Sequence, residues 1–267
     1  MITILVDPNN YKSYYANHDK VNKPFIISLE KDKSKYETSK KILTRLGLSP
    51  VRFNAIYGKQ LKETNPSIYN KFKKLNDGEI GCFLSHFSIY YLAALHKNQN
   101  QYTMIFEDDI GTDLNKVTFQ KKFNDILKYN ANLVYLGKCA EFCNNIKKID
   151  NDIYEGYRPY CMHAYLIKNS YARKLVRNIL QLNKIAYPID VVIFNWVENN
   201  DIIEFHPSIF YQDAKYVSNL RNKIRQMANE FECRDQMQLP KRSIKMHIDK
   251  IILIIVFIVV YIIAVNK

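Results

Sequence analysis

The stretch Gly78–Asp109, GEIGCFLSHFSIYYLAALHKNQNQYTMIFEDD, decides the fold of this chain. Its second half contains a short apolar run, residues 104–106, which predicts a strand buried in a sheet. Three consecutive carboxylates follow: Glu107, Asp108 and Asp109. Ligands of open α/β sheets gather beyond the carboxyl ends of the strands, where these acids should emerge. Clustered oxygen ligands suit Mg²⁺ or Mn²⁺ holding a substrate phosphate, and an acidic turn that caps the next element is the alternative.

The first half of this stretch predicts a helix from Glu79 to Leu95 with Asp77 as its N-cap, because apolar residues recur at three- and four-residue spacing. Gly81 and Ser85 lie one turn apart on the same face. A glycine inside a helix usually permits close approach of another group. His86 taken alone is typical of a hydrogen-bonded core histidine.

The rest of the chain alternates between expected strands and helices, which predicts an α/β fold with a mostly parallel mixed sheet flanked by helices. Residues 138–160 show no clear period and are expected to form a loop, serving as a lid or acceptor rim. The expected strands are residues 24–29, 51–56, 133–136, 162–167 and 202–205, and the other expected helices are residues 34–46, 117–127, 171–182 and 191–197.

Length and charge limit the possible functions. A chain of 267 residues predicts one sizeable domain, and 47% hydrophobic with 24% charged residues is ordinary for a globular protein. The net charge of +13 would suit nucleic acid, an anionic membrane surface or anionic substrates. The lysines are scattered and no nucleic-acid-binding motif occurs, so we expect no nucleic-acid partner.

The cysteines favour a reducing compartment. Cys139 and Cys143 are four residues apart, but no second Cys or His pair supplies the spacing of a zinc site. Cys82 and Cys161 lie in apolar segments and are expected to be reduced, packed thiols. Residues 1–10 lack the apolar core of a secretory signal. We therefore expect a cytosol-facing domain.

The last residues predict a membrane anchor. Residues 251–265 form an uninterrupted apolar run of 15 residues, shorter than the roughly 20 of an average membrane span. A buried strand or helix is the alternative. Lys250 and Lys267 bracket the run and can reach the two interfaces. The basic segment 241–245 on the amino side predicts that the domain faces the cytoplasm. Residues 241–267 thus read as a basic linker and a single-pass C-terminal helix.

The order GEIGC-x-LSH, followed by an apolar strand that ends in EDD, resembles glycosyltransferase family 25. This family includes bacterial lipooligosaccharide galactosyltransferases and procollagen hydroxylysine galactosyltransferases. The resemblance extends over roughly residues 23–220 and implies a single GT-A-like catalytic domain at 23–240 behind a lead at 1–22. The family's arginine after the first strand is replaced by Lys31, Lys33 and Lys35. Matching segments, in family order, are residues 25–29, 53–58, 163–167, 172–175, 188–190 and 207–218.

The resemblance also implies a reaction and a set of site residues. The donor would be a UDP-hexose, carrying galactose or glucose, and the acceptor a hydroxyl of a glycan, glycolipid or protein. Mn²⁺ (or Mg²⁺) would be held by Asp108 and Asp109. Asp190 would be the general base of an inverting transfer, with an ordinary helix N-cap as the alternative. The donor-binding residues implied are Ser28, Leu29, Tyr57, Gly58, Ser85, His86 and Glu107.

Two further functions stay open beside this one. The first is a catalytically inactive member of the same fold that binds a sugar or a partner. The second is a metal-dependent phosphotransfer or nucleotidyl enzyme, for which the sequence offers no glycine-rich P-loop.

Overall fold

The computed structural model describes residues 7, 20–198 and 201–213. The expected basic linker and membrane anchor, residues 241–267, lie outside the described residues. No helix in the described ranges is long and apolar enough to cross a membrane.

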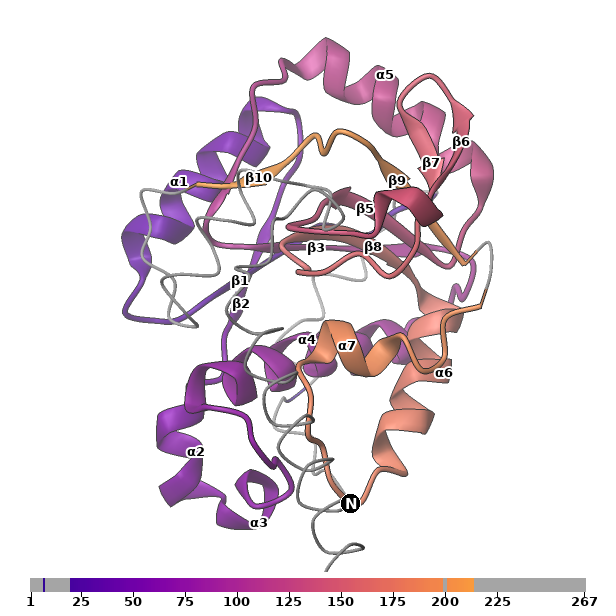
Figure 1. Ribbon diagram of the computed structural model, residues 1–267. Helices are drawn as coiled ribbons and strands as arrows, with labels where there is room; N and C mark the ends of the chain where they lie inside the picture. The colour runs from indigo at the N-terminus through magenta and orange to yellow at the C-terminus, as the bar shows by residue number, and fades with distance from the viewer. Residues whose placement is uncertain (1–6, 8–19, 199–200, 214–267) are drawn as a thin grey trace, which may run out of the picture. The chain divides into compact units, whose positions relative to one another are not determined.

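A mixed sheet forms the centre of the described part of the chain (Figure 1). Its eight strands follow the order β2-β1-β3-β8-β5-β9-β7-β6, and β8 and β7 run against the others. A two-stranded sheet pairs β4 (Ile110–Gly111) with β10 (Tyr211–Gln212). The α/β class with a mostly parallel mixed sheet is confirmed. The strands are β1 (Phe25–Ser28), β2 (Val51–Asn54), β3 (Tyr102–Glu107), β5 (Leu133–Gly137), β6 (Lys147–Asp150), β7 (Ile153–Glu155), β8 (Ala164–Lys168) and β9 (Ile202–Phe205).

Helices cover both faces of the sheet (Figure 1). Alternate strand residues point to opposite faces, so Ile105 and Tyr165 join one hydrophobic cluster while Met104 and Leu166 join another. The first cluster includes residues of α4 (Asp77–Leu95), α6 (Asn169–Leu180) and α7 (Ile189–Ile193), together with α2 (Gly58–Thr64) and α3 (Pro66–Tyr69). The second includes residues of α1 (Lys33–Arg45) and α5 (Lys116–Ile126).

Helix α4 begins at Asp77, two residues before the expected Glu79, and its N-cap is Asn76 rather than Asp77. The Asn76 side chain accepts a hydrogen bond from the Glu79 N–H at 2.9 Å, and the Glu79 carboxylate accepts one from the Asn76 N–H at 2.9 Å. This reciprocal capping box satisfies two backbone donors at once, which Asp77 could not do from inside the first turn. The Asp77 carboxylate instead accepts from the Tyr69 hydroxyl at 2.7 Å.

Residues 138–160 are not the loop that the sequence predicts. They include a short 3₁₀ helix (Cys143–Asn145) and the hairpin of β6 and β7, which lies at one edge of the sheet because β7 pairs with β9. Cys161 is not a reduced thiol either. It forms a disulfide with Cys139, whose Cα atom lies 5.5 Å away. This bond ties the residue after Lys138 to the segment that enters β8.

Candidate active site

A pocket of about 310 Å³ lies beyond the carboxyl ends of β1, β2 and β3, with one wall formed by α4. Parallel strands bring their carboxyl ends to the same edge, which explains why segments far apart in sequence meet here. Every residue predicted to bind donor or metal lines this pocket: Ser28, Leu29, Tyr57, Gly58, Ser85, His86, Glu107, Asp108 and Asp109. Asp190 is not among its lining residues.

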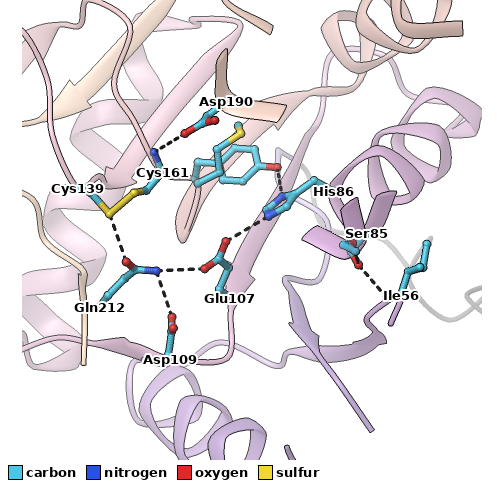
Figure 2. A network of polar contacts seen from close by, with 12 residues as sticks. Ile56, Ser85, His86, Glu107, Asp109, Cys139, Cys161, Asp190 and Gln212 are labelled. Carbon is cyan, nitrogen blue, oxygen red and sulfur yellow. Dashed lines mark hydrogen bonds and ion pairs between the residues drawn. A yellow bond between two sulfur atoms is a disulfide. The ribbon is translucent and has the colours of Figure 1, made fainter. Parts of the chain in front are cut away.

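The acidic triplet meets a residue from the end of the described chain (Figure 2). Gln212 Nε2 donates to Glu107 Oε2 at 3.2 Å and lies 3.5 Å from Asp109 Oδ1. Gln212 reaches this place because β10 pairs with β4 directly after the triplet, and the Asp213 N–H donates to the Asp109 carbonyl at 2.7 Å. The amide of Gln212 thus separates two carboxylates that would otherwise repel each other.

Asp108 carries a perturbed carboxyl in the pocket lining. Burial raises its pKa to about 7, a hydrogen bond from Ser28 and the charge of Lys35 oppose this rise, and Asp109 and Glu107 add to it. A cluster of carboxylates whose charges raise one another's pKa favours a bound cation. The oxygen donors of Asp108 and Asp109 therefore fit Mg²⁺ or Mn²⁺.

A second donor set in the pocket is softer. Cys82, His86 and Glu107 each bring one potential ligand atom within 4.8 Å of the others. Burial, and after it the charge of Glu107, raises the pKa of the Cys82 thiol well above its ordinary value, so the neutral thiol is favoured. A hard cation prefers carboxylate oxygens over this set.

His86 contacts Glu107 of the triplet (Figure 2) and, on its other side, the buried Tyr165. Its Nδ1 lies 2.9 Å from the Tyr165 hydroxyl and its Nε2 lies 3.4 Å from Glu107 Oε1. The Tyr165 hydroxyl donates in turn to the Tyr90 hydroxyl at 3.0 Å, which extends this chain of contacts into the core. His86 therefore holds Glu107 in place from the core side of the pocket.

Ser85 and Gly81 fix the connection between β2 and α2. The Ser85 hydroxyl accepts from the Ile56 N–H at 2.9 Å and donates to the Gly81 carbonyl at 2.7 Å. A Cβ on Gly81 would lie 2.4 Å from the Ile56 carbonyl oxygen, so only glycine permits this approach. Tyr57 follows with its side chain 38% exposed, and the Lys31 Nζ lies 5.2 Å from the centre of its ring. Through these two backbone hydrogen bonds, Ser85 holds the segment at Ile56 against α4.

Several pocket residues were missed or given no role by the sequence prediction. Lys31 and Lys35 line the pocket, whereas Lys33 does not, and Lys59 adds another cation. The sequence pattern that could have indicated Lys31 and Lys35 is the group of lysines after the first strand. Cys82 was expected to be only a packed thiol, and Gln212 had no assigned role.

Asp190 lies in the first turn of α7, whose N-cap is Pro188, so Asp190 is not the N-cap of this helix. Its Oδ2 accepts from the Cys161 N–H at 3.0 Å (Figure 2). Its Oδ1 accepts from the Val191 N–H at 2.9 Å. Burial raises the pKa of the Asp190 carboxyl, those two hydrogen bonds oppose the rise, and the nearby charge of Glu107 adds to it. Asp190 is therefore electrostatically coupled to the acidic pocket.

The sequence that builds this fold and most of this pocket matches the model of a known protein family. The model of Glycosyltransferase family 25 (LPS biosynthesis protein) matches residues 21–193, more than half of the chain. The chain therefore belongs to glycosyltransferase family 25, a family of transferases.

Individual relatives agree with this assignment. Procollagen galactosyltransferase 1-B of Xenopus laevis is 26% identical over 215 residues, covering 73% of this chain and 34% of the relative. A glycosyltransferase 25 family member of Drosophila melanogaster is 26% identical over 204 residues, covering 70% of this chain and 30% of the relative. The chain spans about a third of the length of these curated relatives. Among solved structures, mouse xyloside xylosyltransferase 1 in its apo form covers 71% of this chain and 70% of its own, with 12% identity and a TM-score of 0.30.

Proposed function

We propose that this protein is a metal-dependent, inverting glycosyltransferase that moves galactose or glucose from a UDP-sugar to a hydroxyl of a glycan, glycolipid or protein. The observation that carries the proposal is the composition of the pocket at the sheet edge. Carboxylates of the triplet lie in the same pocket as Lys31, Lys35 and Lys59. Such a pairing suits a metal-bound diphosphate, which needs both oxygen ligands for the cation and cations for its own charge.

The pocket residues divide the work of holding a UDP-sugar. Asp108 and Asp109 would hold Mn²⁺ or Mg²⁺, which neutralises charge on the departing diphosphate. The lysines would contact the outer phosphate oxygens. The half-exposed ring of Tyr57 offers a face on which the uracil base can stack. Glu107, which contacts His86 and Gln212, would accept a hydrogen bond from a ribose hydroxyl.

Asp190 would act as the general base. The acceptor oxygen forms a bond to the anomeric carbon, the bond from that carbon to the diphosphate oxygen breaks, and the hydroxyl proton passes to Asp190. Burial raises the pKa of the Asp190 carboxyl towards the operating pH, which suits a base that must take up a proton. Because the proton acceptor must be ionised, the rate should fall as the pH drops below that pKa.

The test is UDP release from UDP-galactose and UDP-glucose, with and without Mn²⁺. We expect metal-dependent release by the wild type and a loss of at least about 100-fold in Asp109→Asn, comparable to removal of a charge-stabilising group. Asp125→Asn is the matched control, because Asp125 lies on α5 outside the pocket lining and its carboxylate pairs with Lys128 at 2.6 Å. Asp190→Asn should lose transfer and keep metal-dependent UDP binding.

Two results would contradict the proposal. Turnover by Asp109→Asn at the wild-type rate would remove the metal assignment. A wild type that binds UDP with Mn²⁺ but releases none from either donor, in the presence of acceptors, would favour the inactive sugar-binding alternative.

A further inference from the structure

A second pocket, of about 390 Å³, lies among residues that the donor site does not use. Its walls contain four aromatic rings together with the side chains of Arg158 and two asparagines. No Asp or Glu is among its lining residues. The four rings belong to Phe142, Tyr157, Tyr160 and Phe194.

Two residues of this pocket are sequence neighbours of Asp190, the candidate base, or of its hydrogen-bond donor Cys161. Val191, which lines it, directly follows Asp190 in α7. Tyr160, which also lines it, directly precedes Cys161, whose N–H donates to Asp190. The Asp190 carboxyl in turn senses the charges of Glu107 and His86 in the donor pocket. Asp190 therefore adjoins residues of the second pocket and interacts electrostatically with Glu107 of the donor pocket.

Buried charges anchor the wall of the second pocket. The Tyr157 N–H donates to the Glu141 carboxylate, which is fully buried and pairs with the Lys138 ammonium at 2.5 Å. Lys138 also pairs with Glu204 of β9. Burying three ionisable groups is costly unless they satisfy one another, so this arrangement fixes the position of Tyr157 firmly.

The same wall is held at its other end by backbone and disulfide contacts. The Tyr160 N–H donates to the Ala140 carbonyl at 2.8 Å, and the disulfide joins Cys161 to Cys139. Arg158 and Cys161 adopt left-handed backbone conformations, with φ of 55° and 65°. Such conformations persist where the surroundings enforce them, and they concentrate at functional sites. The pocket wall is a preformed structure.

The chemistry of the walls matches an acidic sugar. Aromatic rings pack against the C–H faces of a pyranose, and the amides of Asn145 and Asn195 can bond its hydroxyls. Arg158 is exposed and lies over the Tyr157 ring at 5.5 Å. Within the described part of the chain no carboxylate forms an ion pair with Arg158, so its guanidinium is available to an external anion. A guanidinium binds carboxylate or phosphate in a two-pronged geometry.

We propose that the second pocket is the acceptor subsite and binds a glycan whose sugar carries a carboxylate or a phosphate, with Arg158 selecting the anion. The inference rests on the proposed glycosyltransferase function, because the bound sugar is the one whose hydroxyl attacks the anomeric carbon and gives its proton to Asp190.

The test is a binding titration by saturation-transfer NMR on the whole protein, with UDP and Mn²⁺ saturating the donor pocket. The probes are methyl β-D-glucuronide, glucose 6-phosphate and the neutral methyl β-D-glucoside. We expect Arg158→Gln to weaken binding of at least one anionic probe about tenfold, since a charge-assisted bond is lost, and to change glucoside binding less than about twofold. Arg177→Gln, on an exposed position of α6 outside both pocket linings, is the matched control and should bind like the wild type.

The probes distinguish a carboxylate from a phosphate as the bound anion. The titrations also distinguish a failure of the proposed acceptor subsite from a failure of the proposed glycosyltransferase function. Tighter binding of the glucuronide identifies a carboxylate, and tighter binding of the phosphate identifies a phosphate. The acceptor subsite is overturned if neither anion binds more tightly than the glucoside, or if Arg158→Gln binds them like the wild type at an unchanged melting temperature. Failure of UDP to bind the wild type with Mn²⁺ would instead overturn the proposed function, while the probe titration without UDP still decides whether the pocket binds acidic sugars.

Discussion

The Asp108 side chain in the donor pocket has a raised pKa because it is buried beside other carboxylates. Burial is the largest cause of its raised pKa, and two neighbouring carboxylates add to it. The pKa of Asp108 is about 7 in the folded, metal-free protein and 3.8 in an unfolded chain. Between these two pH values the folded protein keeps a proton on Asp108 that the unfolded chain has released. Cation binding must displace this proton, so metal affinity should rise with pH up to about 7.

Asp108→Asn should stabilise the metal-free protein at pH 8. Between pH 4 and 7, approximately, the folded state binds more protons than the unfolded state, so the wild type's free energy of unfolding falls as pH rises through this window. The uncharged amide removes this loss, which we expect to amount to about 1 to 3 kcal/mol at pH 8 after allowance for partial exposure. Urea unfolding at pH 4, 6 and 8 measures it.

The same series carries its own control. Mn²⁺ should stabilise the wild type more than the variant, because the variant lacks one ligand oxygen charge. If Asp108→Asn is less stable than the wild type at pH 8 and equally stabilised by Mn²⁺, the electrostatic account of this residue is wrong.

The sequence predicted the acidic residues better than their partners. An apolar run ending in EDD is a local pattern, so Glu107, Asp108 and Asp109 could be placed at a strand end from the sequence alone. The contact between Gln212 and Asp109 joins residues 103 positions apart. That contact depends on the pairing of two-residue strands β4 and β10, which are too short to leave a hydrophobic period.

At the scale of elements, α4 is the helix that shapes the donor pocket. Its glycine at position 81 lies against the segment between β2 and α2, and the reciprocal glycine at position 58 would place a Cβ 1.8 Å from the Asp77 carbonyl oxygen. The helix can therefore approach the turn that carries Tyr57 as closely as backbone atoms allow. Tyr57 owes its place at the pocket to this approach.

Gly81→Ala should destabilise the protein, although alanine is the better helix former. Helix propensity alone would give a gain of about 1 kcal/mol for this exchange. Overlap of the new methyl group with the Ile56 carbonyl should reverse the sign and cost about 1 to 3 kcal/mol. Chemical unfolding measures the stability, and UDP titration should show weaker binding because Tyr57 moves. A variant more stable than the wild type would contradict the close approach.

Elements with a clear period were predictable and irregular ones were not. Helix α6 was expected over residues 171–182 and spans Asn169–Leu180, because its apolar residues recur on one face. The hairpin of β6 and β7 was missed because all four residues of β6 are exposed and show no alternation. Helices α2 and α3 were missed because four to seven residues are too few to reveal a period.

At the scale of the whole molecule, the disulfide changes one expectation about the compartment. Pairing of Cys139 with Cys161 could not be read from spacing, since it depends on the antiparallel neighbours β5 and β8 bringing their flanking residues together. Disulfides persist mainly in oxidising compartments. The Cys139–Cys161 pair therefore no longer supports a reducing, cytosol-facing domain, and that expectation rests on the sequence of residues 1–10 and on the basic segment 241–245.

We still propose that residues 251–265, which lie outside the described residues, attach the protein to a membrane, because lysines bracket this apolar run. The full chain should stay with lipid vesicles after an alkaline carbonate wash, and a chain ending before Lys250 should not. Equal partitioning of the two would contradict the anchor.

The most direct measurement is a calorimetric titration of UDP into the wild type and Asp109→Asn, each with and without Mn²⁺. The account predicts binding to the wild type that requires Mn²⁺, with affinity lost in Asp109→Asn although both proteins melt at the same temperature. UDP binding that is equally tight without the metal, or unchanged in the variant, would contradict the claim that the acidic triplet holds a cation against a diphosphate.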